Sequence, residues 1–114
     1  MSRHKGLQAE ELACVYLREQ GCTIVMRNFA CRFGEIDIIA LKEGVLHFVE
    51  VKSRQQVPPI YALTPIKLAR IVKTIQVYWQ TYPKTMPYCI DAVLIKGTLQ
   101  NYTIEWLENI GFLE

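Results

Sequence analysis

The chain contains two segments in which apolar residues recur at helical spacing, and several shorter runs that are typical of strands. The helical segments cover residues 6–20 and 64–80. Gly21 follows the first segment, where glycine suits the left-handed conformation that ends many helices. Thr64 and Pro65 begin the second, as an N-cap and a proline in the first turn. The apolar positions that we expect these helices to bury are Ala9, Leu12, Ala13, Tyr16 and Leu17, then Leu68, Ile71, Val72, Ile75 and Trp79.

The strand-like runs are separated by turn signals, and they complete the predicted order of elements. They cover residues 23–27, 35–41, 45–52, 88–95 and 102–107. The proline-containing run 55–63 is predicted to be a loop. The order α-β-β-β-α-β-β predicts an α/β fold with a mixed β-sheet flanked by helices. We interpret residues 1–114 as one domain, because a chain of this length can bury a single core.

The turn between the second and third strands decides which side chains face each other. Residues 43–44, Glu-Gly, would form a two-residue hairpin loop in which glycine supplies a positive φ. Lys42 then pairs with Val45, and counting back along both strands places Asp37 opposite Glu50. Directly opposed Cβ atoms lie roughly 4.5–5.5 Å apart, so the two carboxylates would converge. A three-residue loop would turn the acids to opposite faces, and a bulge would also disturb this register.

Two opposed carboxylates, those of Asp37 and Glu50, repel each other unless one takes up a proton or a cation lies between them. Oxygen ligands of this kind suit Mg²⁺ or Mn²⁺, with waters completing the coordination shell. Lys52 shares a strand face with Glu50. There it could orient an attacking water or stabilise negative charge on a phosphate. The competing interpretation is a cross-strand ion pair in which Lys52 neutralises Glu50 or Glu35 on a solvated face.

Two charged residues of the predicted helices belong to the same hypothesis. Glu10 lies within the apolar stripe of the first helix, where a carboxylate needs a partner or a metal. The alternative is local pairing near the helix start. Lys67 lies in the first turn of the second helix, a poor position for a cation unless a phosphate binds there. A solvated lysine is the alternative.

Composition narrows the class of protein without identifying it. Hydrophobic residues make up 51% and charged residues 21%, as in ordinary globular proteins. No apolar run approaches the roughly 20 residues that span a bilayer, and the N-terminus lacks a signal core, so we expect a cytoplasmic protein. A net charge of +2 neither indicates nor excludes nucleic-acid binding. The basic residues that could follow the phosphates of a nucleic acid are Arg27, Arg32, Lys52, Arg54, Lys67, Arg70 and Lys73. Of these we expect Arg27, Arg32, Arg54 and Lys67 to bind nucleic acid. The alternative is that these charges are scattered over a solvated surface.

The cysteines Cys14, Cys22, Cys31 and Cys89 have neither CxxC spacing nor an adjacent histidine pair. This pattern does not indicate a zinc site. In a reducing compartment the thiols would remain free. Cys14 and Cys89 lie in apolar contexts, and we interpret them as small core residues.

Asp37, followed after twelve intervening residues by the tripeptide Glu50-Val51-Lys52, resembles the PD-(D/E)xK signature of restriction-endonuclease-like nucleases. Ile36 stands where the signature has its proline. The flanking sequence is similar to the YraN-like family of small bacterial proteins predicted to be endonucleases, themselves similar in fold to archaeal Holliday-junction resolvases. The similar segments are 6–13, 27–29 (RNF), 34–40 (GEIDIIA), 48–54 (FVEVKSR), 64–67 (TPIK) and the strand that contains Asp91, with Ala9 where a glycine is expected.

The resemblance implies DNA cleavage that depends on Mg²⁺ or Mn²⁺. Asp37 and Glu50 would be metal ligands, with the backbone carbonyl of Val51 as a further ligand. Lys52 would be the catalytic lysine. Glu10 would be an additional ligand or would orient a water.

Two other interpretations remain open beside the nuclease. One is a nucleic-acid binding module that keeps a nuclease-like fold without turnover, and the other is a structural or protein-interaction domain with a surface ion-pair cluster. Within the nuclease hypothesis the substrate is DNA that is linear or branched. Resolution of a four-way junction in recombination or repair would require two active sites, and therefore a homodimer. The aromatic residues considered for an interface, although we expect most to lie in the core, are Tyr78, Trp79, Tyr82 and Tyr88.

Overall fold

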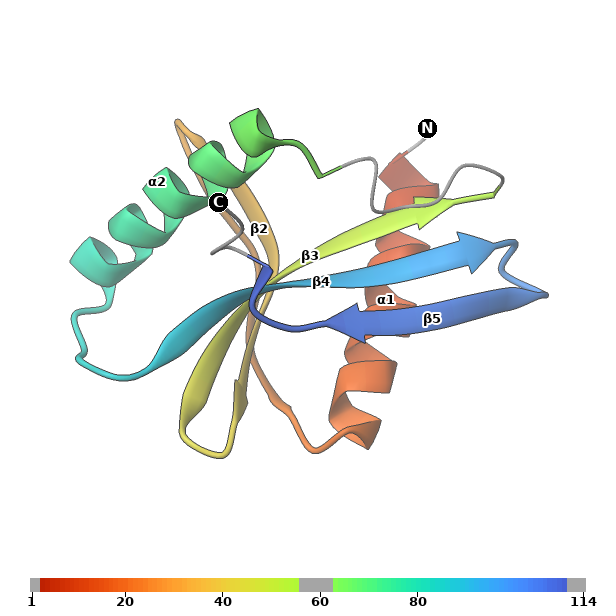
Figure 1. The fold of residues 1–114 in the computed structure, drawn as a ribbon, viewed down its shortest axis with the longest axis horizontal. Coiled ribbons are helices and arrows are strands. Elements are labelled where there is room, and N and C mark those ends of the chain that lie inside the picture. Colours follow the sequence, from red (N-terminus) through yellow and green to blue (C-terminus); the bar gives the residue numbers. More distant parts are fainter. Residues whose placement is uncertain (1–2, 56–62, 111–114) are drawn as a thin grey trace.

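A mixed sheet of five strands forms the centre of a computed structural model that describes residues 3–55 and 63–110 (Figure 1). The strands lie side by side in chain order. Neighbouring strands are antiparallel except β3 and β4, which are parallel. Parallel neighbours need a crossover connection, and α2 lies in the one between them. The strands are β1 (Thr23–Cys31), β2 (Gly34–Lys42), β3 (Val45–Arg54), β4 (Tyr88–Gly97) and β5 (Tyr102–Leu107).

Two helices, α1 (Arg3–Glu19) and α2 (Pro65–Thr81), pack on opposite faces of this sheet (Figure 1). The order of elements is therefore α-β-β-β-α-β-β, which confirms the predicted mixed α/β fold. Consecutive residues of β3 pack in the apolar layers on opposite faces of the sheet, because successive side chains of a strand point to opposite faces. Phe48 packs in the cluster under α2, and Val49 packs in the cluster under α1.

Local signals end and begin the helices as the sequence predicts. Gly21 has φ +97°, in the left-handed region that favours glycine after a helix. Thr64 is the N-cap of α2, and its hydroxyl accepts a hydrogen bond from the N–H of Lys67. These contacts satisfy backbone groups that the helix itself leaves without a partner.

Some details differ from the sequence-based expectation. Strand β1 runs on to Cys31, four residues beyond the predicted end, because it stays paired with β2 as far as Gly34. Val72 was expected to be buried but is 41% exposed, whereas Tyr78 is buried and packs edge to face against Phe48. The buried stripe of α2 is therefore rotated slightly from the predicted one. The predicted loop 55–63 lies mostly outside the described residues.

The side-chain alternation of β2 is interrupted beside Asp37. Ile36 and Ile39 both belong to the apolar cluster under α2, whereas Ile38 belongs to the cluster under α1. A regular strand would point residues 36 and 38 to the same face. The pairing of β2 with β3 also ends here, at the pair Ile38 and Val49. The two strands therefore separate at Asp37, and this separation positions the candidate site.

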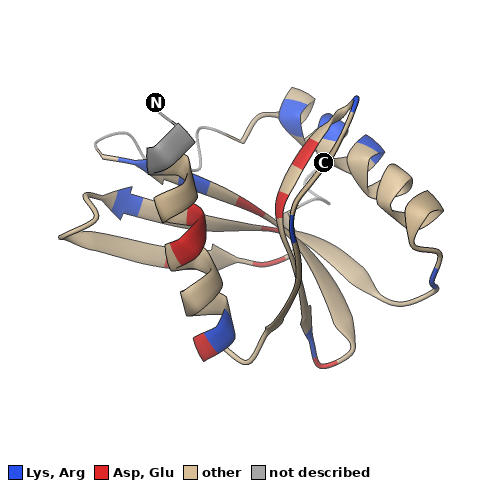
Figure 2. Cartoon of the chain, turned by 180° about the vertical axis from the view of Figure 1, so that it is seen from behind, with Lys and Arg blue, Asp and Glu red and all other residues tan. Residues whose placement is uncertain are grey.

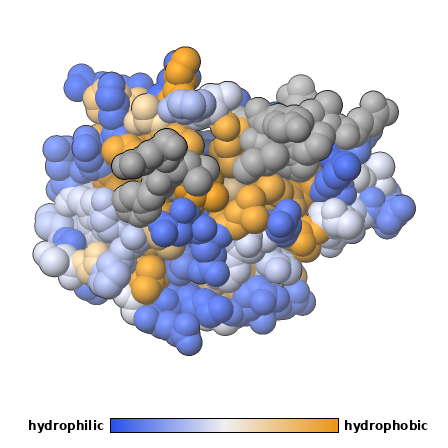
Figure 3. Space-filling model, in the orientation of Figure 1, coloured by the Kyte–Doolittle hydropathy of each residue, from blue (hydrophilic) through white to orange (hydrophobic). Residues whose placement is uncertain are grey.

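The surface is mostly hydrophilic on the face seen in Figure 3, with apolar side chains gathered near the middle. In the described part of the chain, neither helix is long and apolar enough to cross a membrane.

Candidate functional site

Where the backbone pairing of β2 with β3 ends, the carboxylates of Asp37 and Glu50 accept hydrogen bonds from backbone N–H groups. The N–H of Asp37 donates to Oε2 of Glu50 over 3.2 Å, and the N–H of Val51 donates to Oδ2 of Asp37 over 2.8 Å. The ladder itself has the predicted register, since Lys42 pairs with Val45. The expected convergence of the two acids is therefore confirmed. Each carboxylate also satisfies a backbone N–H that the separating strands would leave unpaired.

Burial raises the pKa of both carboxyl groups. The pKa of Glu50 rises to about 8, chiefly through burial and then through the charge of Asp37. The pKa of Asp37 rises to about 6, again chiefly through burial, although the hydrogen bond from Val51 opposes the rise. At neutral pH without a metal, one proton is therefore held by the pair. Hard divalent cations prefer such oxygen ligands, and a bound cation would replace this proton.

A hollow of about 180 Å³ lies beside the acid pair, between the sheet and the start of α2. Its charged lining residues are Glu35, Glu50, Lys52, Lys67 and Arg70. The positive charge of Lys52 lowers the pKa of both Asp37 and Glu50. Among the side chains that are described, those of residues 6–55 and 63–110, Lys52 nevertheless forms no ion pair. The competing interpretation of a cross-strand ion pair is therefore not supported.

Glu10 of α1 also influences Asp37. Its negative charge raises the pKa of Asp37, so the two carboxylates are within electrostatic reach. It does not line the hollow, and its side chain is 14% exposed. A guanidinium nitrogen of Arg27 lies 3.9 Å from Glu10 and another lies 2.9 Å from Glu11. Arg27 is thus engaged with α1 and helps to fix Glu10.

The other basic residues named from the sequence lie in different places. Lys67 lines the hollow with Arg70, whereas Arg32 stacks over the Phe33 ring at 4.7 Å from its centroid. Lys73 approaches the same ring at 5.5 Å, so Phe33 joins the β1–β2 hairpin to α2. Arg54 is exposed and donates to the carbonyl of Ser53. Figure 2 shows the basic positions at the start of α2 and the acidic positions of α1 and the β1–β2 hairpin.

A second group of metal-ligating side chains lies at the other end of β3. In the described part of the chain, His47, Cys89 and Asp91 are the three such side chains whose donor atoms all lie within 4.8 Å of one another. Glu10, Asp37 and Glu50 do not form such a set. Sequence reasoning missed the group, and Cys89 is only half-buried rather than a plain core residue. The available signal was the i, i+2 spacing of Cys89 and Asp91, which puts both on one strand face.

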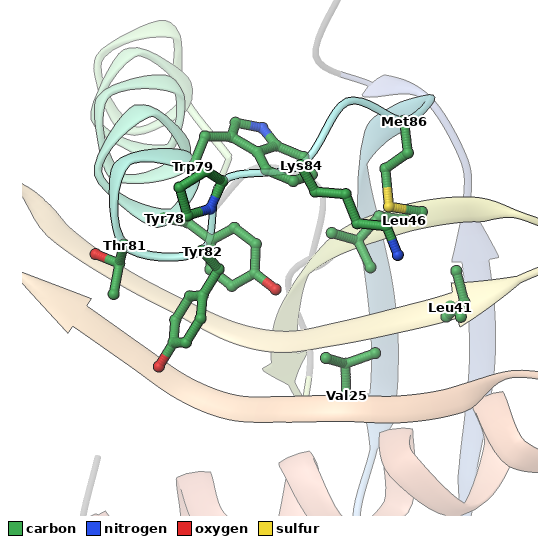
Figure 4. A pocket seen from close by; sticks show the side chains of 10 residues that line it. Val25, Leu41, Leu46, Tyr78, Trp79, Thr81, Tyr82, Lys84 and Met86 are labelled. Atoms are coloured by element: carbon green, nitrogen blue, oxygen red, sulfur yellow. The ribbon is translucent and has the colours of Figure 1, made fainter.

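An apolar hollow of about 460 Å³ lies at the far end of α2 (Figure 4). Tyr78, Trp79 and Tyr82 of the helix end face Leu46 and Met86 across it. The described residues that line it include no carboxylate.

Comparison with known proteins gives a single family over most of the chain. A model of "Uncharacterised protein family UPF0102" matches residues 9–95. A UPF0102 protein of Helicobacter hepaticus is 53% identical over 109 residues, which is 96% of this chain and 96% of that protein. One from Helicobacter pylori is 53% identical, covering 96% of this chain and 93% of that protein. One from Wolinella succinogenes is 50% identical, covering 96% and 98%.

Proposed function

The chain belongs to the UPF0102 family, and from this premise and the geometry of its acid pair we propose that it is a metal-dependent DNA endonuclease. The observation that carries the proposal is the crosswise contact of Asp37 and Glu50, with Lys52 beside them in an open hollow. A purely structural role for the pair would not explain why Lys52 has no ion-pair partner among the described residues. It would also not explain why two basic residues of α2 line the same hollow.

Asp37 and Glu50, with the carbonyl of Val51, would hold the Mg²⁺ or Mn²⁺ ion, which supplies Lewis-acid polarisation and a more acidic attacking water. Lys52 donates hydrogen bonds to the phosphate oxygens as negative charge develops on them. Glu10 does not form a compact donor set with Asp37 and Glu50, so we assign it the orientation of a water rather than direct ligation.

Lys67 and Arg70 provide the contact with the nucleic-acid backbone. Both line the hollow, and Lys67 lies in the first turn of α2, where the free N–H groups favour anions. A scissile phosphate at Lys52 would place a neighbouring phosphate near these two residues. Arg32 and Lys73 extend the positive surface over Phe33. The substrate class that fits this arrangement is a polyanionic DNA strand, in linear or branched form.

Cleavage assays test the proposal. The protein is incubated with linear duplex, single-stranded and four-way-junction DNA in the presence of Mg²⁺, Mn²⁺ or EDTA. We expect cleavage that requires the metal and is lost in Asp37→Asn. Asparagine keeps a side-chain oxygen that can accept the hydrogen bond from Val51. The structure where β2 and β3 separate is therefore preserved while the negative charge is removed.

Glu43→Gln is the matched control, because Glu43 is an exposed acid in the β2–β3 turn and remote from the hollow. It should cut as the unchanged protein does. Equal cleavage by Asp37→Asn and the unchanged protein would overturn the site. Binding without cleavage under every condition would instead support a module without turnover, and absence of both would refute any nucleic-acid function.

A further inference from the structure

His47, Cys89 and Asp91 form a compact donor cluster on the α1 side of the sheet. Strands β3 and β4 run parallel with His47 directly opposite Cys89, and Asp91 follows two residues later on the same face. Nδ1 of His47 lies 2.6 Å from Oδ2 of Asp91 and 3.1 Å from Sγ of Cys89. A nitrogen, a sulfur and a carboxylate oxygen thus point at one another from two adjacent strands.

The Asp91 carboxylate is held from outside the cluster. Nε1 of Trp106 donates to Oδ2 and the N–H of Asn109 donates to Oδ1, each over 2.9 Å. Outer hydrogen bonds of this kind orient the ligands of protein metal sites. Asp91 is fully buried and His47 is 4% exposed, although burying ionisable groups is costly unless they are compensated.

The mixed donor set identifies the class of ion. We propose that His47 Nδ1, Cys89 Sγ and Asp91 Oδ2 bind one borderline-soft transition-metal ion, for which Zn²⁺ is the best match. The hard cation proposed for Asp37 and Glu50 would avoid this sulfur. The cluster is therefore a second site, with a chemistry of its own.

Entry and geometry are compatible with such an ion. His47 and Cys89 line a hollow of about 570 Å³, which gives the ion a path and leaves space for a water as fourth ligand. Tetrahedral zinc would require N···O and N···S separations of roughly 3.3 and 3.6 Å. The observed 2.6 and 3.1 Å must therefore open by roughly 0.7 and 0.5 Å, respectively. Rotation of the half-buried Cys89 side chain and a small shift of His47 would provide this.

Metal binding requires the Cys89 thiol to lose its proton and the ring proton of His47 to lie on Nε2. Burial, followed by the neighbouring Asp91, raises the pKa of the Cys89 thiol to about 12. The thiol therefore carries its proton when no metal is bound, and it releases that proton on binding as the sulfur–metal bond forms. His47 must present a bare Nδ1, so its ring proton moves to Nε2. The affinity should consequently rise with pH.

Titration of the whole protein with Co²⁺ tests the proposal. The reduced protein is first stripped with a chelator, and excess Mg²⁺ is present to occupy the acid pair. We expect one Co²⁺ per chain with thiolate-to-cobalt charge-transfer absorption that Zn²⁺ removes. Fluorescence of Trp106 should also fall, because its ring lies 5.4 Å from that of His47.

Cys89→Ser should lose the charge-transfer band and weaken Zn²⁺ binding by at least roughly tenfold. Cys31→Ser is the matched control, because Cys31 is also a half-buried free thiol but lies at the β1–β2 hairpin. It should bind as the unchanged protein does. If circular dichroism shows that Cys89→Ser does not fold, His47→Gln carries the same expectation of weaker binding. Absence of the band in the unchanged protein, or its loss in Cys31→Ser, would overturn the proposal.

Discussion

The backbone N–H of Asp37 donates to Oε2 of Glu50 across 3.2 Å, at the point where β2 and β3 stop pairing. In return, Asp37 accepts from the N–H of Val51, the residue after Glu50. The two carboxylates therefore close the end of the ladder and lie together in a buried position. An alanine at either place would leave an N–H without its acceptor, which costs about 1–3 kcal/mol. Asp37→Asn and Glu50→Gln remove the negative charge but keep a side-chain oxygen that can accept the hydrogen bond. These substitutions therefore separate the loss of charge from the loss of the acceptor.

The stability of the metal-free protein should fall as the pH rises from about 4.5 to about 8. Glu50 has an ordinary pKa of 4.5 and a folded-state pKa of about 8. Over this range the folded state retains a proton that the unfolded state has lost, so rising pH favours unfolding. Urea denaturation in EDTA at several pH values measures the effect.

Glu50→Gln should flatten this pH profile, because glutamine does not titrate. Mg²⁺ should also raise the stability most at the alkaline end, where the acids are ionised and bind the ion best. A free energy of unfolding that rises between pH 5 and pH 8 in EDTA would contradict the buried acid pair.

Lys52→Ala should reduce kcat by about 10²- to 10³-fold, the usual cost of removing one donor to a transition state. Its positive charge also lowers the pKa of Asp37 and Glu50, so its loss should move the acidic limb of the pH–rate profile to higher pH. Steady-state kinetics across pH measures both effects. Lys84→Ala, at the remote apolar hollow, should change neither. A lower rate with no shift of the profile would place Lys52 away from the acids.

Short-range signals predicted the acid pair, because a hairpin fixes its own register. The Glu43-Gly44 turn determines that Lys42 pairs with Val45, and the alternation of the strands then carries the register to Asp37. The sequence did not reveal that β2 separates from β3 at that residue. The separation depends on Ile36 packing toward α2, which is a tertiary contact.

The second donor cluster could not be predicted in the same way. His47 and Cys89 are brought together by the parallel pairing of β3 with β4, across a crossover that contains α2. No local turn fixes the register of such a pair. The burial of Tyr78 in place of Val72 likewise depends on how α2 rotates over Phe48. Helical spacing limits that rotation without determining it.

Lys67→Ala should weaken DNA binding uniformly across sequences. If Lys67 neutralises one phosphate, the slope of log K against log salt concentration should become shallower by about 0.9. Fluorescence anisotropy in Asp37→Asn, which should bind without cutting, measures the slope. Lys84→Ala has the same change of charge at the other end of α2 and should keep the original slope. Equal slopes in both variants would remove Lys67 from the DNA contact surface.

Gly97→Ala should destabilise the β4–β5 hairpin by roughly 2–5 kcal/mol, combining an unfavourable backbone with a steric clash. Gly97 has φ +119°, and an added Cβ would lie 2.4 Å from the carbonyl oxygen of Asn101. Gly44→Ala is the matched control, since Gly44 has φ +78° but nothing within 4 Å of the added Cβ. It should lose only about 1–2 kcal/mol. Urea denaturation of both variants measures the difference, and equal losses would show that the clash at Asn101 is relieved by movement of the loop.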